Sequence, residues 1–260
     1  MGSVGISLLL TALAGLSTGI GGCIALLAKR GNQKFLSASL GFSAGVMIYV
    51  SMIEIFQEAQ SMLTASLGQV RGSWATPAAF FAGMLFIAAI DQLIPAEENP
   101  HELSGKTSKP AGLLRIGLLT ALAIGIHNFP EGLATFVSAQ QTPEVAIPIV
   151  IAIALHNIPE GIAVSGPIYQ ATGSRRKALG YAFLSGLAEP VGALIGWLVL
   201  MPVMNDTVFG LLFAAVAGIM VFISLDELLP AARAYGHHHL SIYGLIAGMA
   251  VMAASLLLFM

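Results

Sequence analysis

A short motif containing histidine, asparagine, proline and glutamate occurs twice in the chain, as HNFPEG beginning at His127 and as HNIPEG beginning at His156. In an α-helix, residues four apart lie on one face, about 6 Å apart. His127 with Glu131, and His156 with Glu160, therefore each present an imidazole beside a carboxylate. Mixed nitrogen and oxygen ligands suit Zn²⁺, Fe²⁺, Mn²⁺ and Co²⁺, whereas an oxygen-only set would indicate Ca²⁺ or Mg²⁺. Each pair is interpreted as a binding site for one metal ion.

The composition indicates where these pairs lie. Of the 260 residues, 57% are hydrophobic and only 9% are charged, which is far outside the range of soluble globular domains. Apolar runs of about 20 residues recur, each long enough to cross roughly 30 Å of hydrocarbon as a helix. We expect an all-α polytopic membrane protein in which residues 1–260 form one transmembrane transporter domain. Its eight predicted transmembrane helices cover residues 5–28, 35–57, 76–95, 111–139, 144–169, 178–201, 207–230 and 240–260.

Three acidic side chains are predicted to lie deep in the bilayer. Glu131, Glu160 and Glu189 fall near the middle of the fourth, fifth and sixth helices, where each ionised side chain costs about 2.5 to 3.5 kcal/mol. No lysine or arginine falls in the middle of any predicted helix, so protons or metal cations must neutralise the carboxylates. Two facing clusters could hold a pair of ions bridged by Glu131 and Glu160. The predicted metal ligands are His127, Asn128, Glu131, His156, Asn157, Glu160 and Glu189.

The asparagines and prolines of the two motifs have separate expected roles. Asn128 and Asn157 add neutral oxygen ligands, or donors that orient the ligands. Pro130 and Pro159 lack an N–H, so each frees a carbonyl one turn earlier and is expected to kink or open its helix. Unwound backbone at this depth is tolerated where it is buried in protein or lines a polar cavity.

The basic residues predict how the helices are oriented. If the eight helices alternate in direction, ten of the eleven Lys and Arg residues fall in the first, third, fifth and seventh loops, and Arg71 alone falls on the other side. By the positive-inside rule, the side with ten basic residues is cytoplasmic, and both termini face outward. The ten are Lys29, Arg30, Lys34, Lys106, Lys109, Arg115, Arg175, Arg176, Lys177 and Arg233.

The chain also contains an internal repeat. Residues 44–54 align with residues 217–227, and the alignment pairs Ser51 with Ser224 and Glu54 with Glu227. Under the alternating topology the two segments run in opposite directions, which predicts an inverted repeat of helices 1–3 and 6–8 around helices 4 and 5. For helix 1 with helix 6 and helix 3 with helix 8 the likeness is weaker, and a shared Gly, Ala and Met composition explains it equally well. Secondary transporters with inverted repeats place the substrate site at the midplane between the halves.

Several other polar residues have two open interpretations. At the outer end of helix 2 and the inner end of helix 7, they are either entrance and exit ligands for the ion or solvated helix ends. Asp91, near the inner end of helix 3, has the same two interpretations. A histidine run in the last loop either receives departing metal or forms a polar turn. The residues are Glu54 and Glu58 in helix 2, Asp226 and Glu227 in helix 7, and His237, His238 and His239 in the loop.

With these motifs, the chain resembles the ZIP (Zrt/Irt-like) family of divalent metal permeases, close to its bacterial ZupT type. The resemblance covers nearly the whole chain, including HNFPEG, HNIPEG and the GLAEP segment that contains Glu189. It implies uptake of divalent metal ions through a binuclear site in the bacterial cytoplasmic (inner) membrane. We expect zinc as the substrate, with iron, manganese, cobalt and cadmium as open alternatives. The resemblance also implies a methionine ligand from helix 2, for which Met47 is the candidate.

Two rival functions remain open at this stage. The first is export of the same ions, because the ligand chemistry does not set the direction of transport. The second is an intramembrane metalloenzyme, which the missing HExxH sequence and the symmetric spread of ligands disfavour. The expected partners are the metal substrate and the lipid bilayer, with a homodimer as an open possibility and neither nucleic acid nor an organic cofactor.

Overall fold

The computed structural model describes residues 4–27, 29, 32–93, 110–140, 143–200 and 205–258. Within these ranges every regular element is a helix or a π-helical turn (η), and no strand occurs. The elements in chain order are α1 (Val4–Ala25), α2 (Gln33–Val50), η1 (Ser51–Ile55), α3 (Phe56–Leu67), α4 (Gln69–Leu93), α5 (Pro110–Ser138), α6 (Pro143–Thr172), α7 (Arg175–Gly186), α8 (Ala188–Ile195), η3 (Gly196–Leu200), α9 (Asp206–Ile223), η5 (Ser224–Leu228), α10 (Leu229–Ala234) and α11 (His238–Leu258).

Six segments of the described chain are long and apolar enough to cross a membrane, judged by length and composition. Together with the absence of strands in the described ranges, they agree with the expected class of all-α polytopic membrane protein. The segments are Val4–Ala25, Gln33–Leu67, Gln69–Ile90, Arg175–Val199, Asp206–Ala234 and His238–Leu258.

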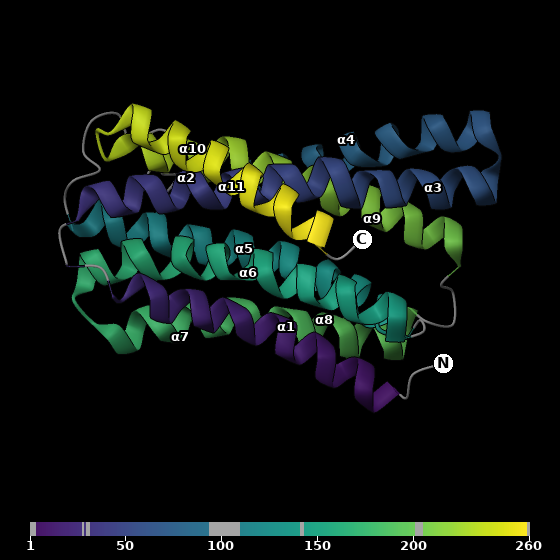
Figure 1. Ribbon diagram of the computed structural model, residues 1–260, viewed down its shortest axis with the longest axis horizontal. Helices are drawn as coiled ribbons and strands as arrows, with labels where there is room; N and C mark the ends of the chain where they lie inside the picture. Colours follow the sequence, from purple (N-terminus) through teal and green to yellow (C-terminus); the bar gives the residue numbers. More distant parts are fainter. Residues whose placement is uncertain are drawn as a thin grey trace.

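The long helices lie side by side along one axis, with α5 and α6 in the middle (Figure 1). On one side, α1 packs on α6, and α7 and α8 pack on α5. On the other side, α2 packs on α11 and α4 packs on α9, and this group meets the central pair where α2 contacts α6 and α9 contacts α5. We call α1 with α5 to α8 the α1 bundle, and α2 to α4 with α9 to α11 the α2 bundle. The central place of α5 and α6 puts both HNxPEG motifs inside the molecule.

One helical hairpin is longer than hydropathy predicted. The second apolar run was expected to end at residue 57 and the third to begin at residue 76, but the helices continue to Leu67 and resume at Gln69. Gly68 turns the chain between them with φ of +83°, a conformation that glycine adopts without a Cβ penalty. Hydropathy locates where the apolar stretch ends, whereas the helix ends only where the backbone is turned.

Of the two expected effects of the motif prolines, a kink or an opening of the helix, the opening is absent. Helices α5 and α6 continue unbroken through Pro130 and Pro159, because both are held on several sides by neighbouring helices and lose one backbone hydrogen bond each. The interruption lies instead at Leu187, between α7 and α8. Pro190 follows three residues later and cannot donate to the carbonyl of Gly186. Glu189 is therefore placed in the first turn of α8.

The two segments paired by the sequence repeat share an unusual local structure. The π-helical turn η1 begins at Ser51 and the π-helical turn η5 begins at Ser224. In each, the serine hydroxyl donates to the carbonyl of a methionine four residues earlier, at 2.6 Å for Met47 and 2.7 Å for Met220. Because π-helical turns are rare, their occurrence at equivalent positions makes the two segments more alike than a shared amino-acid composition would.

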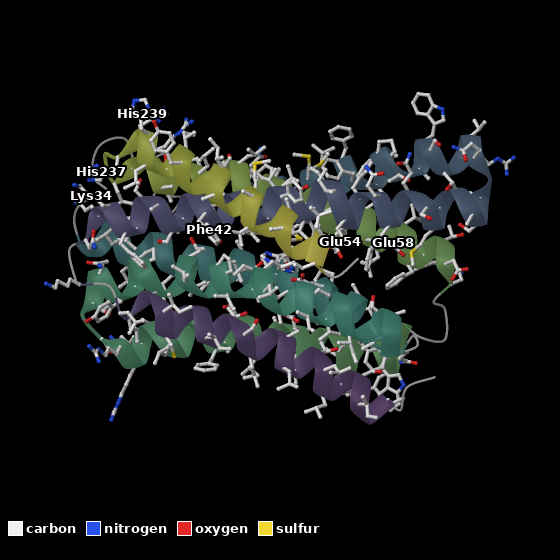
Figure 2. The ribbon with its side chains drawn as sticks, viewed as in Figure 1. Lys34, Phe42, Glu54, Glu58, His237 and His239 are labelled. Atoms are coloured by element: carbon white, nitrogen blue, oxygen red, sulfur yellow. The ribbon has the colours of Figure 1, made fainter. Side chains whose placement is uncertain are left out.

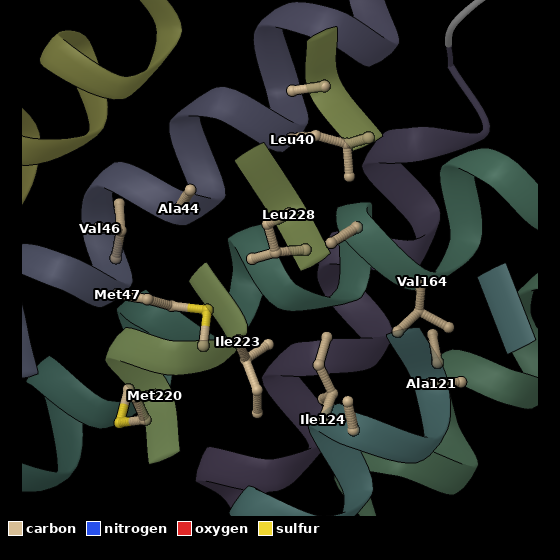
Figure 3. Close-up of a cluster of buried hydrophobic side chains, with 14 of the residues drawn as sticks. Leu40, Ala44, Val46, Met47, Ala121, Ile124, Val164, Met220, Ile223 and Leu228 are labelled. Carbon is tan, nitrogen blue, oxygen red and sulfur yellow. The ribbon is translucent and has the colours of Figure 1, made fainter. Parts of the chain in front are cut away.

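Apolar side chains fill the space between the two bundles. Figure 3 shows Leu40 and Met47 from α2, Ile124 from α5 and Val164 from α6 in one cluster with residues of α9 and η5. Met47 is completely buried there. The boundary between the bundles is thus made by side chains that can repack, with the polar centre lying beside it.

Candidate metal centre

The two motifs are joined across helices as well as along them. The Nε2 atom of His127 on α5 lies 2.9 Å from Oε1 of Glu160 on α6, and Nε2 of His156 on α6 is in close contact with Oε1 of Glu131 on α5. The i, i+4 spacing predicted that each imidazole would stand with the carboxylate of its own helix. The packing of α5 on α6 adds the reciprocal contacts, so the two motifs form one centre.

Three of these residues are already close enough to share one ion. His127, Glu131 and Glu160 each offer a ligand atom, and the three atoms lie within 4.8 Å of one another. The side chains of His127 and Glu160 are fully buried, and Glu131 is 3% exposed. One imidazole nitrogen and two carboxylates make a set suited to a divalent transition metal. Because all three side chains are buried, the carboxylates need a cation or protons nearby.

The two asparagines donate through their amide groups to residues of α1, α7 and α8. Asn157 donates through Nδ2 to Oε1 of Glu189 and to the carbonyl of Ala14 at 3.0 Å, while Asn128 donates to the carbonyl of Ser185 at 3.3 Å. Each amide is thereby oriented, and its oxygen is left over as a neutral ligand. Sequence reasoning did not find Ala14 and Ser185, because a backbone carbonyl acceptor leaves no signal in residue type.

Every one of the seven predicted ligands has an unsatisfied buried atom. Buried polar groups in proteins are nearly always hydrogen-bonded, so seven exceptions in one place require an explanation. These are atoms that a divalent cation could coordinate, and no buried lysine or arginine among the described side chains neutralises them. The atoms without a hydrogen-bond partner in the described residues are Nδ1 of His127 and His156, Oδ1 of Asn128 and Asn157, and Oε2 of Glu131, Glu160 and Glu189.

A cavity leads from the centre toward the end of the molecule at which α3 turns into α4. Its volume is about 140 Å³, and Glu131 and His156 lie at its inner part. Glu54 on η1 and Glu58 on α3 also line it, and Figure 2 shows them one turn apart along the same helical segment. Glu58 is exposed and Glu54 is half-buried. Residues four apart in a helix lie on one face, which is why both glutamates reach the same cavity.

The remaining predicted pathway residues lie elsewhere. Met47 is buried in the apolar cluster of Figure 3, where Met220 and Ile223 are also found. Asp226 and Glu227 are half-buried on η5. Asp91 is in the last turn of α4, and its side chain lies outside the described part of the structure.

The histidine run lies at the other end of the molecule from the α3–α4 turn. In Figure 2, His237 and His239 are found near Lys34, where α10 is followed by α11 and α2 begins. His238 and His239 are exposed, and their rings are in edge contact at 5.5 Å between centroids. The backbone carbonyl of His237 accepts a hydrogen bond from Ser37, which ties this turn to α2.

Comparison with known proteins places this centre in a family. A family model described as ZIP Zinc transporter matches residues 91–256. The zinc transporter ZupT of Streptococcus mutans is 68% identical over 254 residues, covering 96% of each chain. The proteins of the same name from Clostridium perfringens and Lysinibacillus sphaericus are 59% and 60% identical, covering 100% and 99% of this chain and 98% of their own. The resemblance seen in the motifs is therefore confirmed, and the chain belongs to the ZIP family of transporters.

Proposed function

We propose that this chain takes up divalent transition-metal ions, with zinc as the first substrate, across the bacterial cytoplasmic membrane. The observation that carries the proposal is the set of seven buried ligands, each with an unsatisfied atom, around the joined motifs. Zinc is the ion in the names of the relatives, the ligand chemistry also suits iron, manganese and cobalt, and cadmium is proposed as a further substrate. Because the chain belongs to a transporter family, the rival function of an intramembrane metalloenzyme is rejected.

The proposed site is binuclear. His127, Glu131 and Glu160 hold one ion, for which their ligand atoms are already gathered. Asn157 and Glu189, which are in contact with each other, contribute to a second position on the α8 side, together with Asn128. The remaining oxygens of Glu131 and Glu160 bridge the two ions, which explains why each carboxylate has one oxygen engaged and one without a partner.

Zinc flux into proteoliposomes tests this function and its pH dependence. Imidazole and carboxylate must be deprotonated to bind metal, so protons compete with the ion and the apparent affinity is expected to fall as the pH falls. The measurement is initial flux at two pH values with Zn²⁺, Fe²⁺, Mn²⁺, Co²⁺ and Cd²⁺ in turn. Flux with none of these ions, or an affinity that rises on acidification, contradicts the proposal.

We propose further that the chain crosses the membrane eight times with both termini outside. Helices α5 and α6, which are 29 and 30 residues long, supply the two crossings beyond the six already described. In Figure 1, successive helical segments run in alternate directions between the two ends of the molecule. This is the arrangement that places the first, third, fifth and seventh loops on one side of the membrane. Lys34 lies at the end occupied by the histidine run, which is the proposed cytoplasmic side (Figure 2).

Reporter fusions provide a direct check of this topology. Alkaline phosphatase joined after Leu258 is expected to be active, because the enzyme needs the oxidising space outside the cytoplasm to form its disulfides. The same enzyme joined after Gly173, in the turn between α6 and α7, is expected to be inactive. Green fluorescent protein at the same two sites serves as the control with the opposite response. Activity at Gly173 and none at Leu258 contradicts the orientation.

The contacts made by glycines suggest which parts move during transport. Several helix contacts inside the bundles depend on glycines at which a Cβ would overlap the backbone of a neighbouring helix. Gly161 meets Thr18 and Gly132 meets Glu189 inside the α1 bundle, whereas Gly83 meets Ala215 inside the α2 bundle. Among the described glycines, every such backbone contact joins two helices of the same bundle.

Contact between the bundles is of a different kind. Gly166 on α6 meets only the side-chain end of Leu36 on α2, and the apolar cluster of Figure 3 fills much of the boundary between the bundles. Backbone contacts fix helices in place, whereas flexible side chains can slide and repack. We therefore propose that the α1 bundle, which holds the whole metal centre, rocks against the α2 bundle to alternate access, and that the inverted repeat supplies the two end states.

Glu54 and Glu58 are proposed as entrance ligands, and Asp226 and Glu227 as exit ligands. The cavity supports the first assignment, because it connects both glutamates with Glu131 and His156. Replacing Glu54 and Glu58 together by glutamine is expected to raise the KM for zinc with little loss of kcat, since the pair concentrates cations at the mouth and is not part of the central site. Zinc uptake measured at low and high ionic strength checks this, because the difference between wild type and variant should shrink as salt screens the charge.

An exporter with the same site is the competing function. The direction of transport is assigned here from the family, and efflux of labelled zinc from preloaded vesicles, without influx under the opposite gradient, would favour export. A homodimer remains a proposal for the assembly in the membrane.

A further inference from the structure

A second cavity opens on the side of the molecule between α4, α5 and α9, and we call it the lateral groove. Its volume is about 670 Å³, and all its lining residues are Ala, Gly, Val, Leu, Ile, Phe or Pro. Phe86 of α4, Phe129 of α5 and Leu212 of α9 are among the residues that line it. With no charged or hydroxyl-bearing side chain in the lining, the groove offers nothing to a metal ion or a lipid headgroup.

The lateral groove lies at the depth of the hydrocarbon. Its residues come from the interior of α4, α5 and α9 and not from the ends of these long helices. The side chains of Phe86 and Phe129 are 57% and 37% exposed, and they continue into an apolar outer surface that includes Phe81 and Leu122. In a membrane protein this surface faces acyl chains, so the groove is an indentation of the lipid-facing surface.

A missing side chain keeps the groove open. A Cβ added at Gly125 would meet nothing within 4 Å, whereas a Cβ added at Gly83 on the opposite wall would overlap the backbone of Ala215. Gly83 is thus required for the packing of α4 on α9, and Gly125 is not required for any helix contact. The empty space beside Gly125 forfeits dispersion contacts unless an apolar molecule fills it.

We propose that the lateral groove binds one acyl chain of a bilayer phospholipid. A thin, flexible and wholly apolar occupant fits the lining, and acyl chains are the apolar molecules present at this depth. The walls come from both bundles, α5 from the α1 bundle and α4 with α9 from the α2 bundle, so the bound chain contacts both at their boundary. The proposal does not depend on which ion the protein carries.

The test uses the full chain in vesicles of phosphatidylethanolamine and phosphatidylglycerol. These contain a trace of phosphatidylcholine with a diazirine near the end of one acyl chain, which places the reactive group at the depth of the groove. After illumination, labelled peptides are mapped by mass spectrometry. The expected result is enrichment of label on the groove segments of α4 and α5, with loss of that enrichment in Gly125→Leu and its retention in Gly180→Leu. Gly180 on α7 is the matched control, since a Cβ there also meets nothing within 4 Å.

A second pair of variants covers the case in which Gly125→Leu does not fold. Phe86→Ala removes an exposed wall of the groove and should lower the label, whereas Phe81→Ala, on the same helix and 59% exposed but outside the lining, should not. Label spread over all exposed apolar faces and equal in every variant overturns the proposal. A dimer that is present without illumination, and that Gly125→Leu converts to a monomer, also overturns the proposal. In that case the groove would be a contact between two copies of the chain.

Discussion

Replacing Glu131 by glutamine is expected to abolish zinc uptake while leaving the protein in the membrane. The amide keeps the shape of the side chain but removes the charge, and Glu131 is in contact with His156 and is proposed to bridge two ions. Substituting a residue that only supports a metal ligand lowers the metal affinity roughly 10- to 100-fold. Substituting a bridging ligand should lower it by at least the upper end of that range. His127→Ala should have the same effect. Uptake of labelled zinc by cells or vesicles is the measurement.

Asp206→Asn is the matched control for this experiment. It removes one carboxylate from the exposed first turn of α9, away from the proposed ligands, so uptake should continue. Wild-type uptake in Glu131→Gln would refute the site, and equal loss in Asp206→Asn would point to a general effect of charge.

The same variants separate binding from transport. Metal that binds the folded state stabilises it by about 2.7 kcal/mol at a concentration 100 times the Kd. Zinc should therefore raise the unfolding temperature of the wild type and of Asp206→Asn, and should have little effect on Glu131→Gln. A wild-type protein that zinc does not stabilise would contradict a resident site at the two motifs.

The second large effect is expected from Gly132→Leu, which should prevent α5 from packing on α8. A Cβ at this position overlaps the backbone of Glu189, so the strain should equal or exceed the roughly 1 to 3 kcal/mol that ordinary overpacking costs in a core. The displaced backbone belongs to a proposed ligand, so the metal centre should be lost together with stability. The midpoint of thermal unfolding of the purified protein in detergent measures the change.

Gly125→Leu is the control, because it makes the same substitution in the same helix, seven residues earlier, where the added Cβ meets nothing. Leucine is also the better helix former by up to about 1 kcal/mol, so this variant should unfold no earlier than the wild type. If the two variants unfold at the same temperature, close backbone packing at Gly132 does not hold the α1 bundle together.

The sequence by itself determined the class of the protein and the identity of the candidate ligands. Long apolar runs require helices in a bilayer, because the backbone can satisfy its hydrogen bonds there only within itself. Carboxylates without basic neighbours at that depth require a cation or protons. These are properties of residue type and spacing along one helix, so His127, Glu131, His156 and Glu160 were found before any packing was known.

The tertiary structure decided how these residues meet. It joined His127 to Glu160 and His156 to Glu131 across two helices, whereas spacing along one helix can pair only residues of that helix. It also placed Met47 among apolar side chains and moved the helix break from the motif prolines to Leu187. Each of these depends on which helices are neighbours and how closely their backbones approach, and that is settled by the packing of all the helices together.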